Sequence, residues 1–197
     1  MDVNHENLMR MLNEASGRTI GAVEQFSFGI KKIRWKTVSF TIPTTPEPSH
    51  RPRLCGYRVY VPGAAKNQSF FDKNVRPTLG GLFITTPCQI IADAYMETPK
   101  SFTQTQKILA EMRLIRPWTN SGDVDNISKA LYDMMGGNKK RGIKGIMIDD
   151  CIVVDSITRL YYSATPRYEV TIKYMSNVDA KLMKLLRIDR FIEEKGE

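Results

Sequence analysis

The chain has 197 residues, of which 42% are hydrophobic and 25% charged, and its formal net charge is +8 at pH 7. This composition excludes a mainly disordered chain and supplies enough apolar residues for one sizeable core. The most apolar run, 145–154, is split by Asp149 and Asp150, so we expect no membrane span. The first seven residues lack the basic and apolar segments of a signal peptide, and we therefore expect a cytoplasmic protein.

The hydrophobic pattern predicts helices and strands in alternation along the chain. Helices are expected over 4–15, 68–75, 101–114 and 126–135 and from 177 onward, and strands over 33–42, 57–61, 82–96, 146–160 and 168–174. Gly17 is expected to end the first helix and Ser101 to cap the third. Together these elements predict the α+β class, with a small mixed sheet and packed helices over 34–175. A helical extension over 1–33 and a C-terminal helix over 176–197 would be additions to that domain.

Cysteine and histidine are too sparse to suggest a zinc or histidine-based site. Cys55, Cys88 and Cys151 are odd in number and far apart in sequence, so we interpret all three as small buried apolar side chains. Only His5 and His50 could supply an imidazole.

Basic residues are concentrated in two stretches. Between residues 31 and 76 there are ten Lys or Arg and two acidic residues, a net of +8 that matches the excess of the whole chain. A second group lies in the glycine-flanked loop 136–145. The residues that we expect to contact a polyanion are Arg34, Lys36, Arg51, Arg53, Arg58, Lys139, Lys140, Arg141 and Lys144. Charge alone does not distinguish DNA from RNA, from a membrane surface, or from a face that only keeps the protein soluble.

Six aspartates between residues 123 and 155 form the most specific pattern. Asp125, Lys129 and Asp133 follow at four-residue steps, which places them on one face of the predicted helix. Asp149 and Asp150 interrupt an apolar run, where charge is costly unless it lines a cleft or binds a cation. Three carboxylates at about 5 Å would repel by roughly 3 kcal/mol per pair at an effective dielectric near 20. Oxygen ligands alone favour Mg²⁺ or Mn²⁺.

The same aspartates have a purely structural interpretation. Asp123 or Asp125 would cap the helix, Asp133 would pair with Lys129, and Asp149 with Asp150 would form a polar hairpin turn. The double aspartate, bracketed on both sides by apolar residues, favours the metal site over this interpretation.

Two segments carry a resemblance to a known family. Residues 123–133 read Asp-x-Asp-Asn-x-x-Lys-x-x-x-Asp, and residues 148–155 read Ile-Asp-Asp-Cys-Ile-Val-Val-Asp. This two-part pattern is similar to that of the RusA family of Holliday-junction resolvases, and the likeness extends over about 34–175. The chain differs in a longer spacer between the two segments and in Arg159, where the family pattern leads us to expect a lysine.

The resemblance implies roles for individual residues. It implies that Asp123, Asp125 and Asp150 hold Mg²⁺ or Mn²⁺, that Lys129 takes part in catalysis, that Asn126 and Asp149 support the site, and that Asp133 orients the helix or Lys129. It also implies a homodimer that acts on four-way DNA junctions.

These observations together predict a metal-dependent endonuclease. It would resolve Holliday junctions or other branched DNA by paired symmetric nicks, in recombination, repair or phage DNA processing, in a bacterial or phage-infected cell. Two alternatives stay open: a protein that binds branched DNA without cutting it, and a nuclease for RNA or flaps.

Overall fold

The computed structural model describes residues 5–31, 34–49, 53–55, 58–60, 63–117, 123–137, 142–176, 178 and 183–184. The helices are α1 (His5–Glu14), α2 (Gly17–Lys31), α3 (Ala64–Asn74), α4 (Gln104–Glu111) and α5 (Val124–Met135), with short 3-10 helices η1 (Arg76–Leu79) and η3 (Asp150–Ile152). The strands are β1 (Arg34–Ile42), β2 (Arg53–Cys55), β3 (Arg58–Tyr60), β4 (Cys88–Glu97), β5 (Val153–Ser163) and β6 (Arg167–Ser176). This is the predicted α+β class. Within these ranges no helix is both long and apolar enough to cross a bilayer.

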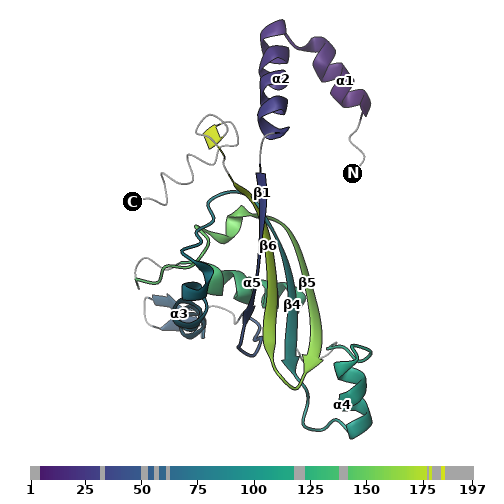
Figure 1. Cartoon of the computed structure of the whole chain (residues 1–197), viewed down its shortest axis with the longest axis vertical. Helices are drawn as coiled ribbons and strands as arrows, with labels where there is room; N and C mark the ends of the chain where they lie inside the picture. The colour runs from purple at the N-terminus through teal and green to yellow at the C-terminus, as the bar shows by residue number, and fades with distance from the viewer. Residues whose placement is uncertain are drawn as a thin grey trace.

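One four-stranded mixed sheet organises the fold, in the order β1-β6-β4-β5 (Figure 1). β6 pairs antiparallel with both β1 and β4, whereas β4 and β5 are parallel. Strands β2 and β3 form a separate antiparallel pair. Because β5 lies at one end of the order, the described chain places no strand on its outer side.

The core lies on one face of the sheet. Alternate residues of the two central strands, such as Ile90 and Ala92 on β4 and Val170 and Ile172 on β6, are buried. Helices α3 and α5 lie together on this side (Figure 1). The opposite face carries polar side chains such as Thr171. The sheet therefore has one helix-covered face and one face on which polar residues alternate with the core positions.

Several predicted elements are confirmed and some details are wrong. The helices over 4–15 and 126–135 and the strands over 33–42 and 168–174 match α1, α5, β1 and β6 closely. Gly17 does not simply end a helix, because α2 begins there. Ser101 is not the cap of α4, because Thr103 accepts a hydrogen bond from Gln106 N and donates its own N–H to Gln106 Oε1 in a capping box. The helix expected from 177 onward falls almost wholly outside the described residues.

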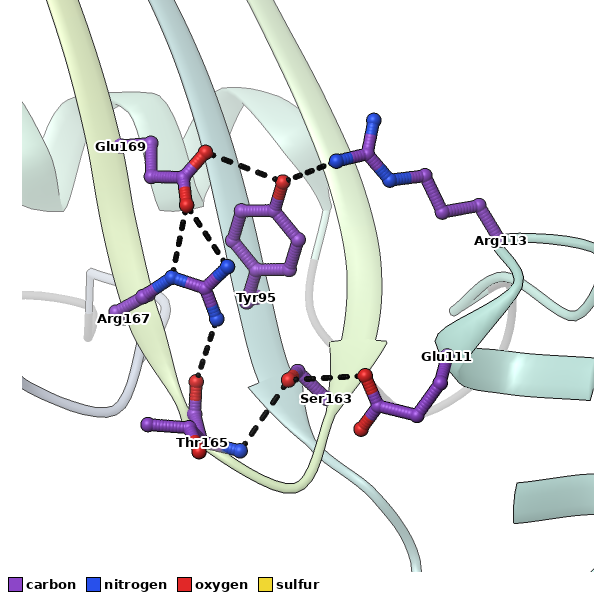
Figure 2. A network of polar contacts seen from close by, with 7 residues as sticks. All are labelled: Tyr95, Glu111, Arg113, Ser163, Thr165, Arg167 and Glu169. Carbon is purple, nitrogen blue, oxygen red and sulfur yellow. Dashed lines mark hydrogen bonds and ion pairs between the residues drawn. The ribbon is translucent and has the colours of Figure 1, made fainter. Parts of the chain in front are cut away.

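Polar contacts fasten α4 to the end of the sheet (Figure 2). Arg113 Nη2 donates to Tyr95 Oη over 2.8 Å, and this hydroxyl donates to Glu169 over 3.2 Å. Glu111 accepts a hydrogen bond from Ser163 Oγ at 3.3 Å. Burial, followed by the charge of Glu169, raises the pKa of Tyr95. The tyrosine therefore stays a neutral donor at physiological pH and links β4 to β6 and α4.

Candidate active site

Helix α5 carries most of the predicted site, and its apolar face fixes its position. Ile127, Leu131 and Met135 are fully buried against the sheet and α3, and burying each such side chain stabilises the fold by about 1.5–3 kcal/mol. Ser128 adds a specific contact, because its Oγ lies 2.8 Å from Thr158 Oγ1 on β5. The helix is thus held against β5 with its polar face turned away from the core.

Asp123 and Asp125 stand at the start of α5, and both are exposed. Asp123 occupies the N-cap position with an extended backbone, yet its carboxylate makes no side-chain capping hydrogen bond. At this end of the helix, Ile127 N donates a backbone hydrogen bond to Asp123 O over 3.1 Å. Asp123 is therefore the N-cap residue, as the structural interpretation expected, but its carboxylate makes no capping hydrogen bond and is available for a ligand.

Lys129 and Asp133 continue the polar face of α5. Lys129 is exposed, and in the described part of the chain no ion pair within 4.0 Å joins it to Asp125 or Asp133. Asp133 is half-buried, and this burial raises the pKa of its carboxyl, partly offset by the charge of Lys129. Asn126 lies half-buried on the first turn, where its carbonyl accepts a hydrogen bond from Ser49 N at 3.0 Å. The proline-rich segment before Ser49 thus passes beside the start of α5.

Asp149 and Asp150 are brought next to α5 by contacts of the preceding residues that the sequence did not indicate. The predicted continuous strand over 146–160 is wrong in its first half: Ile84 pairs with Met147 in an isolated bridge, and Ile146 N donates to Met135 O at the end of α5. Glycine is required at position 145, because a Cβ there would overlap Met135 O and Gly136 C and lie 2.5 Å from Gly137 N. Because residue 145 packs so closely against the end of α5, the segment that follows places Asp149 beside the last turn of that helix.

Asp149 and Asp150 form the turn into β5. Asp149 Oδ1 accepts a hydrogen bond from Cys151 N at 3.1 Å, and Asp150 begins η3. Partial burial raises the pKa of the otherwise exposed Asp150, and a hydrogen bond with Asp149, the charge of Asp149 and the charge of Asp133 raise it further. The three-residue η3 also exposes Cys151, so the prediction that this thiol is buried is wrong, whereas Cys88 is buried as predicted. The side chain of Cys55 lies outside the described part.

The structure brings some of the predicted acids together but not all of them. The charge of Asp133 acts on Asp150, whereas Asp125 lies eight residues earlier on α5, about 12 Å along the helix axis. Among the described residues, no three His, Cys, Asp or Glu side chains are close enough to hold a metal ion. The donor chemistry nevertheless fits a hard cation, because partial burial, and after it the charges of Asp149 and Asp133, raise the pKa of Asp150, and a divalent ion offsets such a cost.

The basic residues expected to bind a polyanion are only partly described. Arg34 and Lys36 are exposed on β1, and Lys144 is exposed beside Gly145. Arg53 and Arg58 belong to the β2–β3 pair, but their side chains lie outside the described part, as do Arg51, Lys139, Lys140 and Arg141.

The structure also reveals a cationic cluster that the sequence analysis missed. The guanidinium carbons of Arg113 and Arg116 lie 4.8 and 4.4 Å from the centre of the Tyr161 ring, which stacks on Tyr95. Arg167 lies over the Tyr95 ring at 3.9 Å. Arg167 is distant in sequence from Arg113 and Arg116, so only the fold brings the three together. The one sequence signal was the dense group of basic and aromatic residues between 113 and 118.

Comparison with known proteins identifies the family of this chain. The family model for the endodeoxyribonuclease RusA matches residues 43–173. YqaN of Bacillus subtilis (strain 168), a protein described as uncharacterized, is 31% identical over 150 residues, which cover 71% of this chain and 97% of YqaN. The domain that contains the mixed sheet is thus of an endodeoxyribonuclease class. The chain belongs to the RusA family, and helices α1 and α2 lie outside the matched domain.

Family membership indicates the general class of activity. RusA proteins are Mg²⁺-dependent crossover junction endodeoxyribonucleases that bind branched DNA and act as dimers. Membership therefore implies an endonuclease of the Holliday-junction resolvase type.

Proposed function

We propose that this protein is a metal-dependent endonuclease that resolves Holliday junctions or similar branched DNA by two symmetric nicks. The observation that carries the proposal is that the charges of Asp133 and Asp149 both act on Asp150, where the last turn of α5 meets the start of β5. The uncommitted carboxylate of Asp123 stands on the same helix. The family match over 43–173 supports this assignment.

Asp123, Asp125 and Asp150 would hold Mg²⁺ or Mn²⁺ in this proposal. All three side chains are exposed, but in the described part of the chain no three acidic side chains lie close enough to share one ion, so the proposal requires the start of α5 and the turn into β5 to approach each other when the ion binds. When bound, the ion supplies Lewis acidity at the scissile phosphate and lowers the pKa of a bound water. Asp149 positions Asp150 by holding the turn through Cys151 N.

Lys129 would provide the positive charge that the carboxylates lack. It lies one helical turn after Asp125 and is not held in an ion pair within the described ranges, so its ammonium can approach a phosphate oxygen. Asp133 lies one further helical turn along and would orient Lys129 electrostatically. Asn126 would support the first turn of α5, where its backbone carbonyl accepts a hydrogen bond from Ser49 N.

DNA would be held mainly through phosphates. Arg34, Lys36 and Lys144 are the exposed members of the predicted basic set. The cluster of Arg113 and Arg116 on Tyr161 adds cations at the other end of the sheet. Affinity for a junction should then fall steeply with salt.

The test is the substitution Asp150→Asn, which keeps the shape of the side chain and removes its charge. Junction binding should persist while cleavage in Mg²⁺ falls by at least about a hundredfold, since a ligand of the reacting centre is lost. Asp72→Asn is a matched control, because Asp72 forms an ion pair with Arg76 on α3 and η1, away from the acidic turn. Wild-type protein that binds a labelled junction tightly but leaves it intact in Mg²⁺ and Mn²⁺ would instead identify a branched-DNA-binding protein without nuclease activity.

Substrate class is tested separately. A panel of four-way junction, flap, linear duplex and single-stranded DNA and RNA should give fastest cleavage of the junction. Faster cleavage of flaps or RNA would favour the alternative nuclease.

A further inference from the structure

The start of β1 carries an exposed tryptophan between two basic residues. Residues 34–37 read Arg-Trp-Lys-Thr, and all four are exposed. Trp35 is 51% exposed, and it is the one exposed large apolar side chain on β1. Leaving half of an indole ring in water, with no apolar neighbour on its own strand to cover it, marks the ring as a surface that a ligand can cover.

Strand pairing places Trp35 on the polar face of the sheet. Val38 and Phe40 of β1 pack against the core, so by alternation Trp35 points to the opposite face. Lys173 on β6 shares that face, because it lies two residues before Met175, which pairs with Trp35. Its Nζ lies 5.5 Å from the centre of the Trp35 ring. This cation–π contact orients the ring and puts a positive charge beside it.

The cations around this ring have no carboxylate partner in the described part of the chain. Arg34, Lys36 and Lys173 are exposed, and no ion pair within 4.0 Å holds any of them there. Asp155, two strands away in the row of Lys173, accepts a hydrogen bond from Gln89 instead. Because β1 stands at one end of the strand order, the long side chains of Arg34 and Lys36 can reach around its edge toward the ring.

We propose that this patch binds single-stranded DNA, with an unpaired base stacked on Trp35 and the adjoining phosphates held by Arg34, Lys36 and Lys173. Aromatic side chains that stack on bases, set beside cations that follow the backbone, hold single strands without sequence preference. A duplex keeps its bases stacked inside, so it offers phosphates but no base face to the indole. A protein partner is disfavoured, because Trp35 stands among charged and polar side chains and not within a contiguous apolar area.

Most of the patch lies outside the family match, yet it is close to the start of β5. Residues 34–36 precede residue 43, where the match begins. One row across the four strands runs through Lys36, Tyr174, Cys88 and Val153. Three inter-strand steps of about 4.8 Å put the two ends of this row about 14 Å apart. The inference rests on the proposed function, because a strand that opens at the branch point would then be held near the acidic turn that precedes β5.

Fluorescence of the ring tests the stacking directly. In a Trp118→Phe background Trp35 is the sole tryptophan, and oligo(dT) or a DNA duplex of the same length is added in EDTA, which prevents metal-dependent cleavage. Base stacking should quench Trp35 with oligo(dT), whereas the duplex should quench it little. No quenching by oligo(dT) would overturn the inference. Equal quenching by the duplex or by a poly-glutamate peptide would also overturn it, because charge alone would then attract the ligand.

Substitutions of Trp35 separate its ring from its apolar character. Trp35→Leu keeps an apolar side chain but removes the ring, so it should weaken binding of a labelled oligo(dT), measured by anisotropy, by about 5- to 140-fold, equivalent to about 1–3 kcal/mol. Trp35→Phe is the matched control, because it keeps an aromatic face and should bind nearly as tightly as wild type. If the leucine variant binds oligo(dT) as tightly as the phenylalanine variant, the ring does not stack on a base.

The salt dependence of binding counts the cations. Each phosphate contact of a single strand contributes about 0.7 to the slope of log K against log salt, so Lys36→Ala and Lys173→Ala should each reduce its magnitude by about that amount. Lys107→Ala is the control, because Lys107 lies on α4 at the other end of the sheet from the start of β1 (Figure 1). Slopes that stay unchanged in both patch variants would contradict the phosphate contacts.

These binding measurements require no DNA cleavage, so the two proposals fail separately. Junction cleavage without quenching of Trp35 by oligo(dT) counts against this site alone. Quenching by oligo(dT) in a protein that leaves junctions intact in Mg²⁺ and Mn²⁺ counts against the proposed nuclease alone.

Discussion

Gly145→Ala should be among the most damaging small substitutions in this chain. Position 145 is where the segment leading to Asp149 passes the end of α5, and a Cβ there would overlap Met135 O and Gly136 C and lie 2.5 Å from Gly137 N. All three are backbone atoms, so no side-chain rotation relieves the overlap. Overpacking a tight site costs about 1–3 kcal/mol, and three backbone overlaps place this one at about 3 kcal/mol.

Thermal and urea unfolding measure the effect of this substitution. For a chain of this size, 1 kcal/mol corresponds to roughly 2–4 °C, so Gly145→Ala should lower the melting temperature by about 6–12 °C. Gly142→Ala is the matched control in the same loop: its φ of +66° disfavours a side chain but no atom lies within 4 Å, so its cost should be about 1 kcal/mol. The account of this backbone passage is refuted if Gly145→Ala melts within about a degree of wild type, or if Gly142→Ala is equally harmful.

Further predictions concern the core, the thiols and pH. Leu131→Ala empties a fully buried position on α5 and should cost about 2–5 kcal/mol by urea unfolding; a loss below 1 kcal/mol would contradict the packing of α5. In a Cys55→Ser background, Cys151 should react with a thiol reagent at pH 8, whereas Cys88, with its pKa raised to about 11 by burial, should react only on unfolding; rapid reaction of two thiols in the native protein would contradict this. Burial raises the pKa of Asp133 in the folded state above 3.8. The ionised carboxylate therefore destabilises the fold at neutral pH, and this destabilisation disappears as the pH falls through the raised pKa and the carboxyl becomes protonated. Asp133→Asn should therefore be more stable than wild type at pH 7, with the difference vanishing below pH 3.8, and lower stability at pH 7 would contradict the burial argument.

Local patterns predicted the elements that local forces determine. Helix α5 follows from apolar spacing, and β6 follows from alternation of Val170 and Ile172 with polar residues. The cap of α4 was also readable, since Thr103 and Gln106 have the spacing of a capping box. Contacts between distant segments could not be predicted from local patterns. Residues 146–148 resemble a strand because they are apolar, but their partners are Ile84 and the end of α5.

The candidate site divides in the same way. Helical spacing alone places Asp125, Lys129 and Asp133 on one face of α5, and the structure has them on one helix. The position of Asp150 depends on the Gly145 passage and on η3, which no periodicity encodes. For the same reason, sequence could not indicate that Asp133 is the α5 carboxylate whose charge acts on Asp150.

Iron-mediated cleavage of the protein itself tests the central claim most directly. Fe²⁺ replaces Mg²⁺ at an oxygen-ligand site, and with ascorbate and peroxide it cuts the backbone beside the bound ion. If Asp123, Asp125 and Asp150 share one ion, cuts should appear both at 123–125 and at 149–151, excess Mg²⁺ should suppress both, and Asp150→Asn should abolish both. Cuts at only one of these segments, or at neither, would contradict a shared metal site.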